Sequence, residues 1–263
     1  MTIFRTLLLS GFMLLVVMTG ASVFASEENV NDIRFPLGKW SPRLIAIVES
    51  GPSILSDDTT FDVPAPPAND SDTTKEELAW LAEIAKTERS EYAVERILFE
   101  NGGRRAHQMF LEEGLIKAEN YKALILFEII DLDHAYFILE RKKHFARPRP
   151  SQLSKEFELI IPNPAHAAYP SGHASQTWIV ALVLSDFDPD NADVYKKWAI
   201  DIAHRREIAG VHYPSDSEAG RNFAVDVLEA LRKVPAFEKK YQAAKESYVK
   251  PSAEVLAAKR EKK

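Results

Sequence analysis

A long apolar segment, Tyr121 to Lys142, lies near the middle of this 263-residue chain. Its apolar residues do not alternate with polar ones, and Pro148 and Pro150 follow its end. Because a helix that is apolar on nearly every side must be buried by its neighbours, the segment predicts a long helix at the centre of a bundle. It also carries charged and titratable side chains that argue against a membrane span: Glu128, Asp131, Asp133 and His134.

Helices are expected along most of the remaining chain. Thr73 and Glu76 form a predicted capping box at the start of one helix. Apolar residues at helical spacing, bounded by Gly and Pro, predict further helices over 91–99, from just after Pro170 to about 185, over 192–209 and over 214–233. Residues 237–263 are rich in Lys, Glu and Ala and are expected to form a solvated helical tail. Since no segment alternates as a strand would, the sequence predicts an all-α, compact single-domain helical bundle.

The N-terminal residues 1–25 are expected to be a signal peptide. Arg5 supplies a positive charge, an apolar stretch follows, and small residues up to Ala25 offer a cleavage site before Ser26. An uncleaved membrane anchor is the alternative, because the apolar stretch is long enough to span a bilayer. Residues 26–72 contain many Pro and Ser residues and are expected to form an irregular arm with one short helix near 44–48. Residues 73–263 are then expected to form the helical domain of a protein exported to a periplasm or to the exterior.

The composition excludes several kinds of chemistry. The chain has no cysteine, which rules out a disulfide framework, a thiolate nucleophile and a Cys-ligated metal. A formal net charge of −6 argues against a general nucleic-acid binder. The seven histidines form no His-x3-His or His-Glu-x2-His pattern, so no metal or other cofactor is expected.

Three short segments place cations or histidines beside predicted helix ends. The first contains Lys142 and Arg149, the second is Pro170-Ser171-Gly172-His173, and the third contains Arg206, His212 and Asp216. A helix that begins near Gly172 would offer free N–H groups and a positive dipole to an anion. Asp216, four residues after His212, could fix the imidazole tautomer and leave the other ring nitrogen free as a nucleophile or base. Lys and Arg suit phosphate oxygens, so the three segments together predict a metal-free phosphoryl-transfer site.

These segments resemble the tripartite signature of the type 2 phosphatidic acid phosphatase superfamily, which reads Lys-x6-Arg-Pro, Pro-Ser-Gly-His and Ser-Arg-x5-His-x3-Asp. Lys142 fits the first part if Arg149-Pro150 is used, because Arg147-Pro148 would need Lys at position 140, which is Glu140. The second part matches without change, and in the third part Arg205 stands where the signature has serine. Residues 63–70 and 178–184 are similar to those of the soluble, exported class A non-specific acid phosphatases of bacteria, which this chain most resembles. Vanadium-dependent haloperoxidases are related.

The resemblance implies a helical bundle and a phosphohistidine route. His212 would attack phosphorus, Asp216 would hold its ring, and His173 would protonate the leaving group and then activate water. Lys142, Arg149, Arg206 and the backbone N–H groups of Ser171 and Gly172 would bind the phosphate oxygens. The expected substrate is a small-molecule phosphomonoester, hydrolysed best at acidic to neutral pH.

Three alternatives stay open at this point. One is a vanadium-dependent haloperoxidase, in which His212 would be the vanadate ligand. A second is a lipid-phosphate phosphatase tethered by an uncleaved N-terminal anchor. The third is a phosphate-binding protein without catalytic activity.

Overall fold

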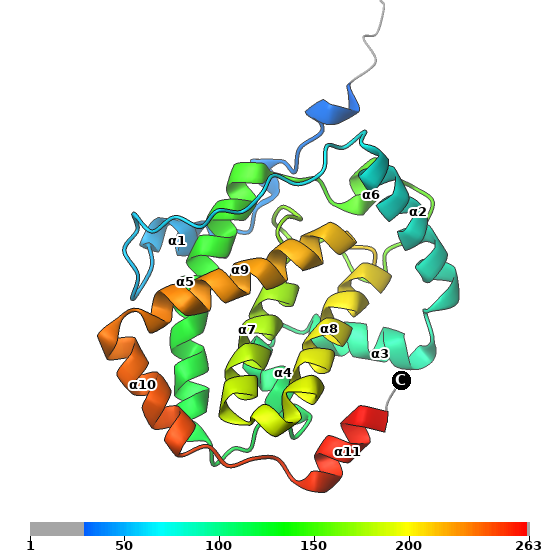
Figure 1. Ribbon diagram of the computed structural model, residues 1–263. Coiled ribbons are helices and arrows are strands. Elements are labelled where there is room, and N and C mark those ends of the chain that lie inside the picture. Colours follow the sequence, from blue (N-terminus) through cyan, green and yellow to red (C-terminus); the bar gives the residue numbers. More distant parts are fainter. Residues whose placement is uncertain (1–28, 262–263) are drawn as a thin grey trace, which may run out of the picture.

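The computed structural model describes residues 29–261, and all regular structure within this range is helical. The all-α prediction is therefore confirmed. The predicted signal peptide lies outside the described residues. Helix α7 (Gly172–Phe187) occupies the middle of the molecule, with α8 (Ala192–Ile208) and α9 (Pro214–Arg232) packed against it (Figure 1).

Helix α5 (Tyr121–Phe145) lies beside this central trio and not at its centre, which corrects the prediction made from its apolar sequence. It packs against α7 and α9, and against α10 (Pro235–Glu246) and α1 (Pro42–Ser50). One face remains open to solvent, where Tyr121, Ile125 and Leu132 are 61%, 55% and 53% exposed. The central position belongs to α7 because its small residues, such as Ala174 and Ala181, let two neighbours approach closely.

Three of the helices before α5 pack on α7 and α8. They are α2 (Asp72–Thr87), α3 (Glu91–Glu100) and the short α4 (Ala106–Glu112), which was not predicted. The N-cap of α2 lies two residues earlier than predicted, because the Ser71 hydroxyl accepts the Thr74 N–H at 3.2 Å and acts as the N-cap in place of Thr73. A further short helix, α6 (Pro150–Leu153), follows α5.

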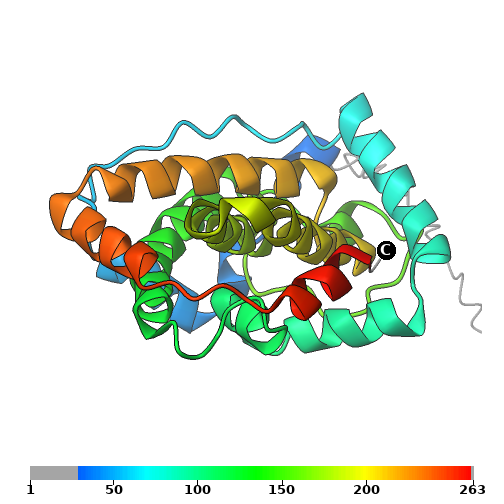
Figure 2. The same ribbon diagram turned by 60° about the horizontal axis from the view of Figure 1, so that its bottom comes forward.

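The N-terminal arm and the C-terminal tail both pack on this framework. In the arm, short 3-10 turns at Val30–Asp32 and Leu37–Lys39 precede α1, and the segment before α2 runs along α9 (Figure 2). The tail is not one solvated helix, as was predicted, but α10 and α11 (Ala253–Glu261), separated by a break. Its apolar side chains Phe237, Tyr241 and Leu256 are buried in the core. No helix in residues 29–261 has the length and apolar character needed to cross a bilayer.

A close contact between α7 and α9 determines where the chemical groups lie. A Cβ atom placed on Gly220 of α9 would be 2.5 Å from the main-chain oxygen of Ser171, directly before α7. The Ser171 N–H also donates to the Asp216 carbonyl at 2.8 Å. The second and third sequence segments are therefore held together through their backbones.

Candidate active site

His212 and Asp216 form a hydrogen-bonded pair at the start of α9. Asp216 Oδ2 lies 2.9 Å from His212 Nδ1 and accepts the Tyr213 N–H at 3.1 Å. On the other side of the ring, Arg149 Nη1 lies 3.0 Å from His212 Nε2. A carboxylate accepts and a guanidinium only donates, so both contacts require the same tautomer, protonated on Nδ1. The Nε2 lone pair consequently faces the cationic side of the site.

Arg149 and Lys142 meet at the same stretch of main chain. Arg149 is completely buried and donates from Nη1 to the Val211 carbonyl at 2.7 Å and from Nη2 to the Ala167 carbonyl at 3.1 Å. Lys142, in the last turn of α5, donates to the carbonyls of Ala167 and Ala168 at 3.1 and 2.8 Å. The second Arg-Pro pair thus brings its arginine to the imidazole, whereas Arg147 contacts Asp216.

Arg206 is the least satisfied of the three cations. It is buried, its Nη atoms lie 3.5 Å from Asn101 Oδ1, and its Nε has no hydrogen-bond partner among residues 29–261. Its neighbour Arg205, at the signature's serine position, points elsewhere and donates from Nε to both carboxylate oxygens of Glu100, at 2.9 and 3.0 Å. Arg205 is therefore already paired, whereas Arg206 retains donors for an anion.

The start of α7 supplies backbone donors, but fewer than the sequence predicted. The Ser171 N–H is bonded to the Asp216 carbonyl, and its hydroxyl accepts the Ala174 N–H at 3.4 Å as the N-cap. The Gly172 N–H belongs to the first turn, where no intrahelical acceptor exists. A Cβ at Gly172 would meet only Lys142 Cε, at 3.8 Å, so the protein leaves space beside this amide. The Ser171 contribution to anion binding is thus limited to its hydroxyl.

The buried charges of the site favour the binding of an anion. Burial, followed by repulsion from Arg149 and Lys142, holds the pKa of His212 well below its usual range. Burial and then Arg206 do the same to the pKa of His173. Burial also lowers the pKa of Arg149 to about 9 and that of Arg206 to about 10. A bound oxyanion would relieve this crowding of positive charge and raise these pKa values.

Several side chains around this centre were not predicted as site residues. His166 Nδ1 lies 3.1 Å from Arg149 Nη2, so the Arg149 fork touches two imidazoles. Asn101, in a turn recognised only as a helix stop, reaches Arg206. Tyr169 donates its hydroxyl to the Pro64 carbonyl at 2.7 Å and ties the arm to the site. The signal for His166 was its position four residues before Pro170 of the Pro-Ser-Gly-His segment, whereas no comparable signal marks Asn101.

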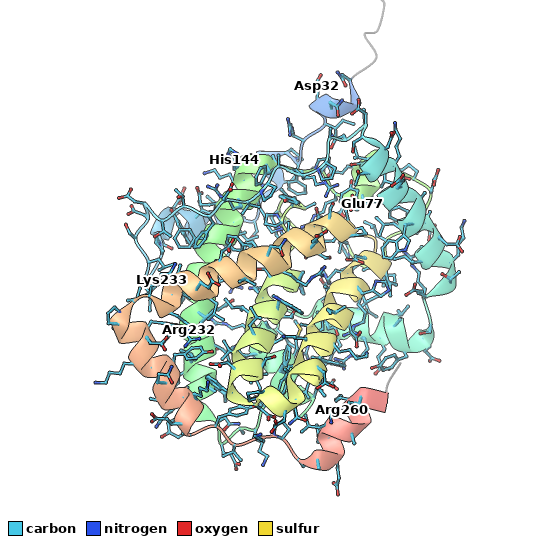
Figure 3. The ribbon with its side chains drawn as sticks, viewed as in Figure 1. Asp32, Glu77, His144, Arg232, Lys233 and Arg260 are labelled. Carbon is cyan, nitrogen blue, oxygen red and sulfur yellow. The ribbon has the colours of Figure 1, made fainter. Side chains whose placement is uncertain are left out.

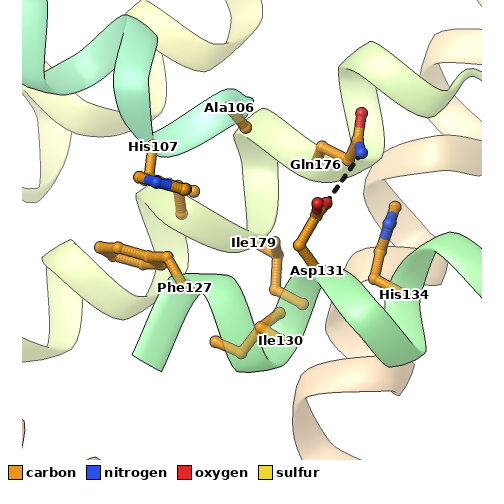
Figure 4. Close-up of a pocket in the computed structure, with 9 residues that line it drawn as sticks. Ala106, His107, Phe127, Ile130, Asp131, His134, Gln176 and Ile179 are labelled. Atoms are coloured by element: carbon orange, nitrogen blue, oxygen red, sulfur yellow. Dashed lines mark hydrogen bonds between the residues drawn. The ribbon is translucent and has the colours of Figure 1, made fainter. Parts of the chain in front are cut away.

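A second cluster of titratable groups lies beneath α7 (Figure 4). His107, Asp131, His134 and Gln176 line a cavity of about 10 Å³, which is room for one water molecule. His134 Nε2 lies 2.6 Å from Ser175 Oγ, and its Nδ1 has no partner in the described part of the chain. Within residues 29–261, no group of three or more His, Cys, Asp or Glu side chains is arranged to hold a metal ion.

Comparison with known families matches residues 123–234 to the PAP2 superfamily. The predicted resemblance is confirmed. The matched segment includes every residue predicted for the site, from Lys142 to Asp216. It also ends beyond α9, so it includes the central trio of helices.

Curated relatives are similar over part of the chain. A non-specific acid phosphatase of Providencia stuartii is 38% identical over 85 residues, which are 32% of this chain and 34% of the relative. One from Salmonella typhimurium is 30% identical over 121 residues, 44% of this chain and 48% of the relative. The chain thus spans half or less of the length of these relatives.

The fold itself is similar to that of a solved bacterial vanadium-dependent iodoperoxidase. The TM-score is 0.51 at 17% identity, covering 65% of this chain and 53% of that one. The predicted PAP2 and haloperoxidase type of bundle is therefore confirmed at the level of fold.

Proposed function

We propose that this chain is an acid phosphatase that hydrolyses small-molecule phosphomonoesters through a phosphohistidine on His212. The supporting observation is the double constraint on His212, with Asp216 on Nδ1 and a cation on Nε2. A nucleophile needs its lone pair directed at the reacting atom, and phosphoryl transfer needs positive charge around that atom. The names of the curated relatives support the same activity.

The side chains suggest a two-step reaction. In the first step Arg149 moves its N–H from His212 Nε2 to a phosphate oxygen, and the freed Nε2 lone pair forms a P–N bond while the P–O bond to the leaving group breaks. His173 gives its proton to the leaving oxygen. In the second step His173 takes a proton from water, whose oxygen attacks phosphorus as the P–N bond breaks and phosphate is released.

Five groups are proposed to hold the non-bridging phosphate oxygens. They are the cationic heads of Lys142, Arg149 and Arg206, the Ser171 hydroxyl and the Gly172 N–H. Burial makes these donors effective because no water competes with the oxyanion. We also propose that residues 1–25 are a signal peptide, that residues 26–72 are an arm, and that the protein acts in the periplasm or outside the cell.

The test is turnover of p-nitrophenyl phosphate by the parent protein and by His212→Ala and His173→Ala, with and without EDTA. We expect His212→Ala to abolish turnover and His173→Ala to reduce it most for substrates with poor leaving groups. The exposed His144, drawn in Figure 3, provides a control, since His144→Ala should leave turnover unchanged.

Alkaline quenching followed by mass spectrometry should detect a phosphoryl group on His212 in the parent, because the P–N bond of phosphohistidine survives base but is hydrolysed in acid. Near-normal turnover by His212→Ala would contradict the assignment. Peroxide-dependent iodide oxidation by vanadate-loaded protein, without phosphatase turnover, would contradict it as well and would favour the haloperoxidase alternative.

A further inference from the structure

Arg147 connects two buried carboxylates, and the proposed reaction gives it no contact with phosphate. Its Nη1 donates to Asp216 Oδ1 at 2.6 Å, and its Nη2 donates to Glu77 Oε2 at 3.0 Å. The guanidinium carbon lies 3.8 Å from the centre of the Tyr213 ring, and the residue is only 2% exposed. Arg147 is therefore fixed on three sides.

We propose that Arg147 and Glu77 are positioning residues that act on His212 through Asp216. This inference depends on the proposed function only for its kinetic consequences, because the hydrogen bonds to Asp216 do not require a substrate. Asp216 has two carboxylate oxygens, and Arg147 occupies Oδ1. Only Oδ2 is then left to face His212 Nδ1, so the carboxylate cannot turn away from the ring without losing a charged hydrogen bond.

Glu77 fixes the other end of this chain of contacts. Its Oε1 accepts the Ser215 N–H at 2.6 Å, in the first turn of α9, while Oε2 accepts from Arg147. Figure 3 shows Glu77 directed from α2 toward this end of α9. Helix α2 lies outside the matched residues 123–234, so an element beyond the superfamily segment completes the support of His212.

Charge balance gives Glu77 a second effect. Two carboxylates and one guanidinium carry a net charge of −1, and this charge lies next to a ring that becomes positive when it is phosphorylated. Without the Glu77 charge, Arg147 and Asp216 would cancel, and the positive ring would be less stabilised. Glu77 thus preserves the anionic character of Asp216 despite its bond to Arg147.

If Arg147 and Glu77 formed a purely structural ion pair, their loss would lower stability but would not change the hydrogen bonding of the His212 imidazole. We therefore distinguish the two roles with Arg147→Gln, Arg147→Lys and Glu77→Gln. The control is Arg232→Gln, which removes another bidentate arginine, paired with Glu238 at 3.0 Å on the surface. The measurements are kcat and KM for p-nitrophenyl phosphate and the ¹⁵N shifts of the His212 ring, which report the hydrogen bonds of Nδ1 and Nε2 without substrate.

We expect Arg147→Gln to lower kcat by about 10- to 100-fold, as loss of an orienting partner typically does, with a smaller change in KM. The ¹⁵N shift of His212 Nδ1 should change as Asp216 turns away from it, while Arg149 continues to donate to Nε2. Arg147→Lys should recover part of kcat, Glu77→Gln should lower kcat with KM nearly unchanged, and Arg232→Gln should match the parent.

Two results would overturn the inference. One is a folded Arg147→Gln protein that keeps the parent Nδ1 shift of His212 and the parent kcat. The other is a folded Glu77→Gln protein with parent kcat, which remains informative if Arg147→Gln does not fold. A parent protein without phosphatase turnover would instead contradict the proposed function, and the ring shifts would still test the positioning role.

Discussion

The site concentrates buried positive charge to a degree that an unliganded protein tolerates only at a cost. Lys142, Arg149 and Arg206 are almost completely buried, and the carboxylates nearest to them already have partners. Burial and repulsion from Arg149 lower the pKa of Lys142 well below its usual range. Such an arrangement is favourable when an anion is bound, so the binding of anions and the protonation of nearby histidines should be coupled.

His173 provides a test of this coupling. Because its pKa is depressed in the free protein, a bound dianion should raise that pKa, and by linkage the dianion should bind more tightly as pH falls. Sulfate is a suitable probe, because it stays doubly charged over the whole pH range used. We expect its affinity to increase between pH 8 and pH 5, by at most about tenfold per pH unit for one proton.

The measurement is inhibition of p-nitrophenyl phosphate hydrolysis by sulfate, or calorimetry, across this pH range. His173→Gln should flatten the dependence, whereas His144→Gln should retain it. A sulfate affinity that does not depend on pH would contradict the coupling.

Arg205 allows a second prediction at the scale of single residues. Restoring the signature's serine with Arg205→Ser would leave the buried Glu100 carboxylate with only Arg96, 3.5 Å away. Removing one partner of a buried ion pair is destabilising, so we expect a loss of about 3 kcal/mol in the free energy of unfolding. Urea denaturation measures it. Adding Glu100→Gln to Arg205→Ser should recover part of the loss, and an Arg205→Ser protein as stable as the parent would contradict the pairing.

At the scale of elements, the contact of α9 with the start of α7 holds the second and third sequence segments together. Gly220→Ala would place a methyl group 2.5 Å from the Ser171 carbonyl oxygen, which is main chain and cannot rotate away. We expect a loss of about 1 to 3 kcal/mol, as overpacking causes, together with a fall in turnover. Thermal unfolding and kinetics measure the two effects.

Gly38→Ala is the matched control, because a Cβ there would meet no atom within 4 Å. Its stability and turnover should equal those of the parent. If Gly220→Ala behaves like Gly38→Ala, the α7–α9 contact does not hold the site as described.

The helices differ in how well the sequence predicts them. Residues 91–99 and 192–209 were predicted nearly to their ends, because caps and apolar spacing are local signals. The short α4 was not predicted, because it has too few residues to give a periodic signal. The break before α11 was not predicted either, because the buried faces of the tail depend on partners that are distant in the sequence. The flanking position of α5 was missed for a related reason, because composition alone does not say which apolar helix has small enough residues to occupy the centre.

In the candidate site, too, local contacts could be predicted from the sequence and long-range contacts could not. His212 and Asp216 are four residues apart, so their contact could be predicted from spacing alone. The bond from the Ser171 N–H to Asp216 could not, because it depends on how α9 crosses the start of α7. The role of Glu77 could not be predicted for the same reason, because its hydrogen-bond partner Ser215 is 138 residues away in the sequence.

At the scale of the whole molecule, the acidic pH that favours the proposed activity lowers the stability of the fold. Burial lowers the pKa of His107 to about 4 and that of His134 to about 3. Each group is neutral in the folded protein and takes up a proton on unfolding below pH 6.5, so its contribution to stability is complete above pH 6.5 and is lost as pH falls toward the folded pKa. His204 has the opposite sign, because Glu207 and Glu88 raise its pKa to about 9 and its contribution is lost only above pH 6.5.

We therefore expect the free energy of unfolding to fall between pH 6.5 and pH 5, with His134 alone accounting for about 2 kcal/mol of the decrease. His134→Gln can still bond Ser175 but cannot titrate. It should be less stable than the parent at pH 7.5, and its stability should fall by about 2 kcal/mol less over the same range. Urea denaturation at several pH values measures this, with the exposed His144→Gln as a control that follows the parent. Parallel pH profiles for His134→Gln and the parent would show that His134 does not titrate on unfolding, and the acid sensitivity would then have to come from His107 and the histidines of the site.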